Sequence, residues 1–215
     1  MQIRSQRRLF ALLFAGATSA AWLGAARAAE APVAPPPWPV ARDPAVTPAA
    51  DPVRPLLMGT LRVTLDGSTL AATLQAIGVG VSQRQGKGTD ALDWLCYTVS
   101  GTAPAQRLWL TSSELSRGRI DAVVAADLPA GAAAASPECP DLPPKFKPVR
   151  FDDGLWLGGL SPELRKGLGI TAKSGPYFSG LFQGQAGNLQ MVSSTVIEFK
   201  GSRAVSLYVA HSTQN

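Results

Sequence analysis

Few side chains of this sequence could carry acid–base or nucleophilic chemistry. His211 is the only histidine and stands fifth from the end of the sequence, so any Ser-His-Asp arrangement would depend on it. Serines are plentiful, but none stands in a Gly-x-Ser-x-Gly motif. We expect His211 to be a solvated side chain and predict no nucleophilic catalysis.

Carboxylates are the second group of candidates, because a pair of them can hydrolyse a glycosidic bond. Asp152 and Asp153 are neighbours, but they stand in Phe-Asp-Asp-Gly, which is typical of a turn. The other acidic candidates are scattered along the chain: Asp66, Asp90, Asp93, Glu114 and Glu163. Asp90-x-x-Asp93 is too little for a calcium site, and residues 80–88 lack the Lys-Ser/Thr ending of a phosphate loop. We expect no metal and no cofactor, and a small periplasmic hydrolase that uses a carboxylate pair stays the alternative function.

Cys96 and Cys139 are the only cysteines. In an exported bacterial protein, one disulfide between them is the simplest interpretation. Two cysteines and one histidine cannot by themselves make a closed structural zinc site. Neither cysteine stands in a Cys-x-x-Cys motif, so the alternative is a pair of free thiols, one of them reactive.

The formal net charge of +5 would suit a nucleic-acid-binding protein. The excess charge, however, lies in residues 1–28, which hold four arginines and no acidic residue. Residues 29–215 carry 16 basic and 15 acidic side chains, with no long run of Lys or Arg. We therefore expect no nucleic-acid partner.

Residues 1–28 have the three parts of a signal peptide. A positive region, Met1 to Arg8, precedes an apolar stretch, Leu9 to Gly24, and Ala26-Arg27-Ala28 has small residues where a signal peptidase reads the chain. We predict cleavage before Ala29 and a periplasmic or secreted protein. An uncut N-terminal anchor is the alternative, although the apolar stretch of 16 residues is short for a membrane span.

Arg7-Arg8-Leu9-Phe10 resembles a twin-arginine export signal. Ordinary arginines of a general secretory leader explain the same residues, so both export routes stay open. No later window of the sequence approaches 18 apolar residues, and we expect no integral membrane span after cleavage.

Two irregular segments separate the parts that are expected to fold. Residues 29–58 hold a run of prolines, which is typical of an extended, semi-rigid linker. This linker is a spacer or, alternatively, a docking site for a proline-recognising partner. Residues 129–150 form a second, Pro- and Ala-rich connection, which contains Cys139.

The two remaining parts, residues 59–128 and 151–215, look related. Each begins with a short alternating strand, a turn and a capping hydroxyl, in Val63-x-Leu65-x-Gly67-x-Thr69 and in Leu155-x-Leu157-x-Gly159-x-Ser161. Each continues with a short helix that ends at a glycine, Leu70 to Ile77 in the first part and Pro162 to Leu168 in the second.

Strand patterns follow in both parts, and Leu108-x-Leu110 matches Leu189-x-Met191. Chance similarity is the alternative to a duplication, because Leu, Gly and Ser are common residues. We predict an α+β fold of two similar units, each a short helix packed on an antiparallel sheet of three to four strands.

A short helix ended by glycine and followed by a meander of antiparallel strands, occurring twice, resembles the tandem architecture of the beta-lactamase-inhibitor proteins. One such unit is similar to the small outer-membrane assembly lipoproteins. Ser68 to Gly78 carries the resemblance, which covers residues 59–127 and 151–211 at the level of pattern only. It implies a protein that binds proteins or peptides on a sheet face and is not an enzyme, and it transfers no binding residue.

Strand periodicity places a set of aromatic and polar side chains on one face of the expected sheet. These are Trp94, Trp109, Tyr208, Arg107 and Thr111. If the helices cover the aliphatic faces, this face is open, and exposed aromatic side chains suit recognition of a partner. Burial under a loop or between the two halves is the alternative for each tryptophan.

These features predict an exported, non-enzymatic binding module that recognises a protein or an envelope component through an exposed sheet face. An enzyme should instead show a cleft with two converging carboxylates of perturbed pKa. An envelope assembly or structural factor, with the proline segment as its spacer, is the third hypothesis.

Overall fold

The computed structural model describes residues 33–36, 54–132, 135–171, 175–186 and 188–214. The predicted signal peptide, its cleavage site and most of the linker at 29–58 lie outside the described residues. All described residues belong to one unit, Pro32–Asn215.

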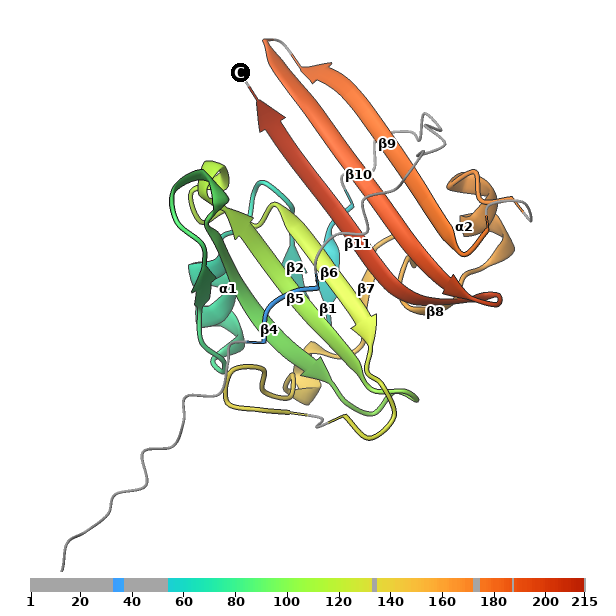
Figure 1. The fold of residues 1–215 in the computed structure, drawn as a ribbon, viewed down its shortest axis with the longest axis horizontal. Coiled ribbons are helices and arrows are strands. Elements are labelled where there is room, and N and C mark those ends of the chain that lie inside the picture. The colour runs from blue at the N-terminus through green and yellow to red at the C-terminus, as the bar shows by residue number, and fades with distance from the viewer. Residues whose placement is uncertain (1–32, 37–53, 133–134, 172–174, 187, 215) are drawn as a thin grey trace, which may run out of the picture. The chain divides into compact units, whose positions relative to one another are not determined.

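Antiparallel β-sheets dominate the fold (Figure 1). The larger sheet has the strand order β3-β4-β5-β6-β11-β10-β9, with β8 paired to β11. Its strands are β3 Gln83–Gln85, β4 Leu92–Val99, β5 Gln106–Ser113, β6 Ala122–Asp127, β8 Gly158–Gly159, β9 Tyr177–Ala186, β10 Leu189–Lys200 and β11 Arg203–Gln214. The smaller sheet has the order β2-β1-β7, formed by Leu61–Val63, Leu56–Met58 and Val149–Phe151.

The two sheets expected from the two similar halves are one continuous sheet. β6 is the last strand of the first half and β11 the last strand of the second, and they pair antiparallel, with Val123 opposite Val209. Pairing these apolar strands covers two edges that separate sheets would leave exposed. The expected antiparallel strands are confirmed, whereas the separation into two units is not, and the duplication stays a prediction.

Two segments expected to be irregular contribute strands. β1 lies inside the predicted linker at 29–58 and β7 at the end of the predicted connection at 129–150. They pair with Leu56 opposite Phe151 and Met58 opposite Val149, and all four side chains are buried. The sequence did not indicate these two strands, because a strand of three residues is too short to show a period.

The two helices begin where their caps predict. α1 spans Leu70–Ile77 and α2 spans Pro162–Gly167. The hydroxyls of Thr69 and Ser161 each accept a hydrogen bond from the backbone N–H three residues later. Gly78 ends α1 in the left-handed region at φ 80°, and α2 ends one residue earlier than predicted. Among the described residues, three 3-10 turns add to these helices: Gly88–Asp90, Glu114–Ser116 and Pro144–Phe146.

One face of the larger sheet carries the main hydrophobic core. The side chains that line it are Leu95, Tyr97, Leu108, Leu110, Val123, Ala125, Leu207 and Val209. α1 and the smaller sheet cover this face, since Leu70, Leu56 and Phe151 belong to the same cluster. Figure 1 shows both behind the larger sheet. The opposite face of the same strands is left for other segments to cover.

Tyr97 should make the stability of this core depend on pH. Its side chain is buried, its hydroxyl donates to the Val79 carbonyl at 3.2 Å, and burial raises its pKa from 10.0 to about 12. The folded state therefore keeps the phenol protonated at a pH where the unfolded state loses that proton. This contribution is constant below pH 10 and is lost as the pH rises to about 12.

We expect the free energy of unfolding of the parent to fall more steeply than that of Tyr97→Phe across this window. Urea unfolding of both proteins at a series of alkaline pH values measures the difference, and groups common to both cancel. A constant difference between the two proteins would contradict the raised pKa.

Candidate functional site

The five predicted binding residues lie on one face of the larger sheet, here called the aromatic face. It comprises Trp94, Trp109, Tyr208, Arg107 and Thr111. Residues directly opposite each other in an antiparallel pair point to the same side. Trp109 is opposite Val124, which is opposite Tyr208, so strands far apart in the chain bring these side chains together. Trp94 is opposite Thr111 in the same way.

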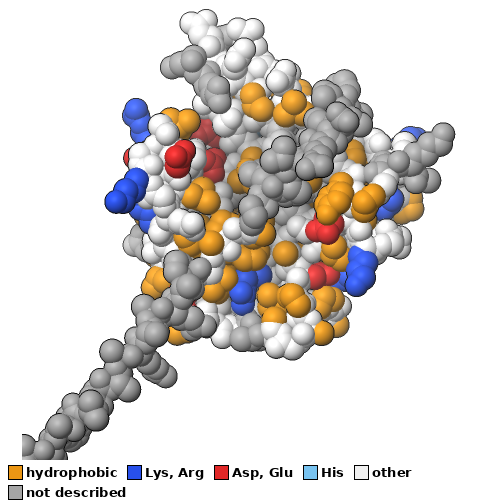
Figure 2. Space-filling model, in the orientation of Figure 1, with side chains coloured by type: hydrophobic (Ala, Val, Ile, Leu, Met, Phe, Trp, Pro, Cys, Tyr) orange, Lys and Arg blue, Asp and Glu red, His pale blue; other side chains and the backbone are white. Residues whose placement is uncertain are grey.

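The tryptophans of the aromatic face are buried, which is the alternative to the exposed face that the strand periodicity allowed. Trp94 is 0% exposed and Trp109 is 6% exposed. Thr111 is also buried, whereas Arg107 and Tyr208 are half-buried. Figure 2 shows apolar side chains gathered on this side of the molecule. Trp94 and Trp109 form a buried cluster, here called the tryptophan cluster, with Val124 and the disulfide Cys96–Cys139. Val33 packs against this cluster.

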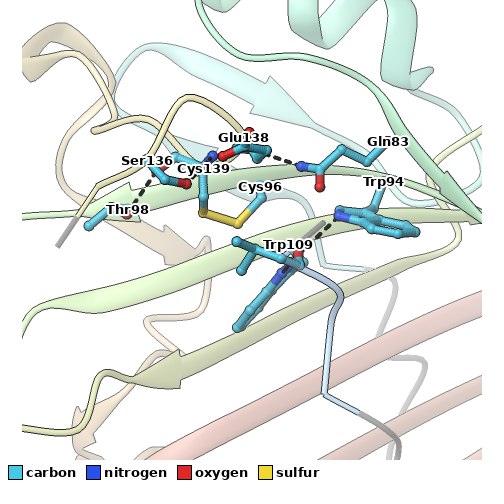
Figure 3. Close-up of a disulfide and its surroundings, with 9 residues drawn as sticks. Gln83, Trp94, Cys96, Thr98, Trp109, Ser136, Glu138 and Cys139 are labelled. Carbon is cyan, nitrogen blue, oxygen red and sulfur yellow. Dashed lines mark hydrogen bonds between the residues drawn. A yellow bond between two sulfur atoms is a disulfide. The ribbon is translucent and has the colours of Figure 1, made fainter. Parts of the chain in front are cut away.

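Trp94 and Trp109 bind one backbone carbonyl together. The indole Nε1–H of Trp94 donates to the Val33 oxygen at 3.1 Å, and that of Trp109 donates to the same oxygen at 3.0 Å. In Figure 3 both rings lie beside the disulfide, with their nitrogen atoms turned toward each other. A carbonyl oxygen has two lone pairs, so this acceptor is fully used and both buried indoles are satisfied.

Segment 33–36, Val33-Ala34-Pro35-Pro36, alternates between the aromatic face and solvent. Val33 and Pro35 are half-buried, while Ala34 and Pro36 are exposed. Packing of Val33 and Pro35 against the sheet is not expected of an unpacked spacer. Richness in proline predicts an extended conformation, but it does not report which surface the extended chain lies on.

The Cys96–Cys139 disulfide is confirmed. Both cysteines are buried, and the loop around Cys139 is also held by hydrogen bonds (Figure 3). The Thr98 hydroxyl donates to the Cys139 carbonyl at 3.1 Å, and the Gln83 amide donates to the Glu138 carbonyl at 2.7 Å. The disulfide thus fixes one wall of the aromatic face.

A cavity of about 400 Å³ lies beside segment 33–36 and is lined by Pro35 and Pro36. Leu92, Val124 and Tyr208 provide its apolar surface. Hydroxyl groups from neighbouring strands also line it: Thr111, Ser113, Ser194 and Ser212. The ionisable residues Asp121 and His211 also line it, so its chemistry suits a largely apolar ligand segment with some hydrogen-bonding groups.

The carboxylate in this cavity is already engaged by its neighbours. Asp121 accepts hydrogen bonds from the Ser113 backbone N–H at 2.8 Å and from the Ser116 hydroxyl at 2.7 Å. Burial and the nearby charge of Asp121 raise the pKa of Tyr208, so its phenol stays neutral. Burial also lowers the pKa of Arg107.

His211 is not the solvated side chain expected from its position in the sequence. It lies in β11, is 5% exposed, and its Nδ1 is 2.7 Å from the hydroxyl of Ser193 on β10. It shares the face of Leu207 and Val209, on the side of the sheet opposite Tyr208. The sequence holds a signal for this burial, because position 211 continues the alternation of 207 and 209. The Ser193–His211 pair is therefore buried, and His211 also contributes to the lining of the cavity beside segment 33–36.

Five of the seven acidic residues considered for hydrolysis face basic side chains. Asp153 contacts Arg54 at 2.5 Å and Asp152 contacts Arg62 at 3.8 Å. Further ion pairs join Asp66 to Arg119 and both Asp93 and Glu114 to Arg84. Within the described ranges, no group of three or more His, Cys, Asp or Glu side chains is placed to hold a metal ion.

Two groups of the site carry no recognisable signal in the sequence. The Val33 carbonyl belongs to the backbone, so its residue type carries no signal for the role. Asp121 carries no sequence signal either, because only the folded chain brings its carboxylate to Ser113 and Ser116.

None of the described helices is long and apolar enough to cross a membrane. No family model, curated protein or solved structure matches this chain.

Proposed function

We propose that this protein is an exported, non-enzymatic binding module that takes an extended segment of a partner protein on the aromatic face. The observation that carries the proposal is the pair of indole N–H groups of Trp94 and Trp109 that meet at one carbonyl oxygen. The buried disulfide is compatible with an exported protein.

Two donors aimed at one carbonyl form a recognition device for a main chain. A main-chain carbonyl is present in every peptide, so this contact supplies affinity without requiring a particular side chain. Trp94 and Trp109 are held rigid by burial, which lowers the entropy lost on binding. Large aromatic side chains with a hydrogen-bonding group are typical of the residues that dominate binding energy at interfaces.

The contacts that segment 33–36 makes do not require a covalent connection to the sheet. They are two hydrogen bonds to Val33 and apolar packing against the tryptophan cluster. An extended segment of another protein can make the same contacts once the chain's own segment has left.

The test uses a variant that frees the aromatic face. Val33→Asp/Pro35→Asp places charges at the two half-buried positions of segment 33–36, where they are costly to bury. The probe is a capped synthetic peptide, Ala-Pro-Val-Ala-Pro-Pro-Pro, with the order of residues 31–37. Indole ¹H–¹⁵N resonances, assigned by Trp→Phe substitution, report the occupancy of the face.

We expect the peptide to bind this variant and to shift the Trp94 and Trp109 indole resonances. Adding Trp94→Phe or Trp109→Phe removes one donor and should weaken binding about two- to tenfold, from a hydrogen bond worth about 0.5–1.5 kcal/mol. Trp156→Phe is the matched control, because its indole donates to Gln106 at 2.9 Å instead. Absence of binding to a folded variant with freed indoles overturns the proposal.

A further inference from the structure

We infer that the partner segment is proline-rich, and that the chain's own segment 33–36 competes with it for the aromatic face. The inference rests on the proposed function and adds the chemical class of the ligand and its regulation. Three observations support it: the Val33 carbonyl that the indoles bind, the apolar cavity beside Pro35 and Pro36, and the covalent connection of the segment to the sheet.

The backbone of segment 33–36 is well suited to accept hydrogen bonds from the two indoles. Val33 is followed by Ala34-Pro35-Pro36, and prolines have no backbone N–H. A polyproline-type segment has no internal hydrogen bonds and a solvated backbone, so its carbonyl groups are available as acceptors. Its φ angles are already restricted, so it loses less conformational entropy on docking than a flexible chain.

The prolines of segment 33–36 lie on an apolar surface. Pro35 and Pro36 lie against the cavity whose apolar walls are Leu92, Val124 and Tyr208. Proline-rich segments bind to aromatic-lined grooves in other peptide-recognition domains, where ring packing and carbonyl hydrogen bonds act together. Both elements are present here within four residues of one segment.

Neither segment 33–36 nor most of the cavity lining carries an ionisable side chain. The cavity carboxylate of Asp121 already accepts from Ser113 and Ser116. An acidic ligand side chain would be repelled by this carboxylate, and any charged side chain would lose hydration on entering the cavity. An uncharged, proline-rich segment avoids both costs.

Segment 33–36 competes with a partner segment for the aromatic face. Residues 37–53 connect segment 33–36 covalently to the rest of the chain, and a covalent connection between a ligand and its site gives an effective concentration on the order of 1 mM. A partner must displace this internal ligand, so its apparent affinity falls by the fraction of molecules whose face is free. Segment 33–36 therefore raises the apparent dissociation constant of every partner, so a weakly binding partner leaves most molecules unoccupied.

The experiment compares two peptides on three proteins. The peptides are the capped Ala-Pro-Val-Ala-Pro-Pro-Pro and the same peptide with every proline replaced by alanine. The proteins are the parent, Val33→Asp/Pro35→Asp, and the control Ala34→Asp, which places a charge at the exposed position between them and keeps both cavity-lining prolines. Dissociation constants come from the Trp94 and Trp109 indole resonances.

We expect the proline peptide to bind Val33→Asp/Pro35→Asp about tenfold more tightly than it binds the parent, from an effective concentration about tenfold above the peptide's dissociation constant. The control variant should behave as the parent does. The all-alanine peptide should bind the freed face at least about tenfold more weakly than the proline peptide, because it lacks the ring contacts and the restricted backbone.

Each contrary result identifies a different error. Equal binding of both peptides to the freed face overturns the proline preference and leaves the binding module standing. Equal affinity of the proline peptide for the parent and for the freed variant overturns competition. Failure of both peptides to bind a freed face overturns the proposed function itself. A parent dimer that Val33→Asp/Pro35→Asp dissociates in sedimentation overturns internal competition in favour of exchange between two copies.

A second route covers the case in which Val33→Asp/Pro35→Asp does not fold. A protease site inserted within residues 37–53 allows the tether to be cut after folding, with the sequence of segment 33–36 unchanged. Cutting should let added proline peptide replace the segment in the indole spectrum, and no replacement at high peptide concentration overturns the competition.

Discussion

Replacing both cysteines, as Cys96→Ala/Cys139→Ala, is expected to lower the free energy of unfolding by about 4 kcal/mol. The disulfide joins positions separated by 43 residues, and in the chain-entropy model a loop of this length strongly restricts the unfolded chain. Both side chains are buried beside Trp94 and Trp109, so their loss also loosens packing at the aromatic face. Urea unfolding of the oxidised parent and of the variant measures the difference.

Reducing agent provides the control for this prediction. Reduction should destabilise the parent by a similar amount and should leave the double-alanine variant unchanged. A variant as stable as the oxidised parent would show that the wall of the aromatic face is held by hydrogen bonds alone, chiefly those of Thr98 and Gln83.

Phe151→Ala is expected to lower the free energy of unfolding by about 3–5 kcal/mol. Phe151 is 0% exposed, lies in β7 and pairs with Leu56 of β1. Its removal leaves a cavity between the smaller sheet and the main core, and the surrounding side chains relax only partly into such a space. Urea unfolding, with circular dichroism to confirm the native fold of the variant, measures the loss.

Arg150→Ala on the same strand is the matched control. Arg150 is exposed, and a surface substitution of this kind usually changes stability by no more than about 0.5 kcal/mol. A cost below about 1 kcal/mol for Phe151→Ala, far under that of a buried aromatic residue, would mean that β7 is a loosely attached connection, as its proline-rich surroundings suggested.

Local signals predicted the local structure well. Thr69 and Ser161 cap the helices because a hydroxyl at that position satisfies a free backbone N–H, and Gly78 ends α1 because it adopts a left-handed backbone at little cost. Period-two alternation also assigned Trp94 and Trp109 to the face opposite Leu95 and Leu108. Each of these features depends on residues close together in the chain, so a single sequence contains the information.

Cys96 and Cys139 were paired correctly for a different reason. A chain with only two cysteines allows a single intramolecular pairing, so counting them was enough. The geometry of the loop around Cys139, which the pairing holds against β4, was not predictable in this way.

Only the tertiary structure decided what covers each face. The joining of β6 to β11 and of β1 to β7 brings together strands from distant parts of the chain, and the residue types of a strand do not name its partner. The burial of His211 and the docking of Val33 on two indoles arise in the same way. Such contacts depend on how packed elements fill space and satisfy backbone groups, which no short window of the sequence encodes.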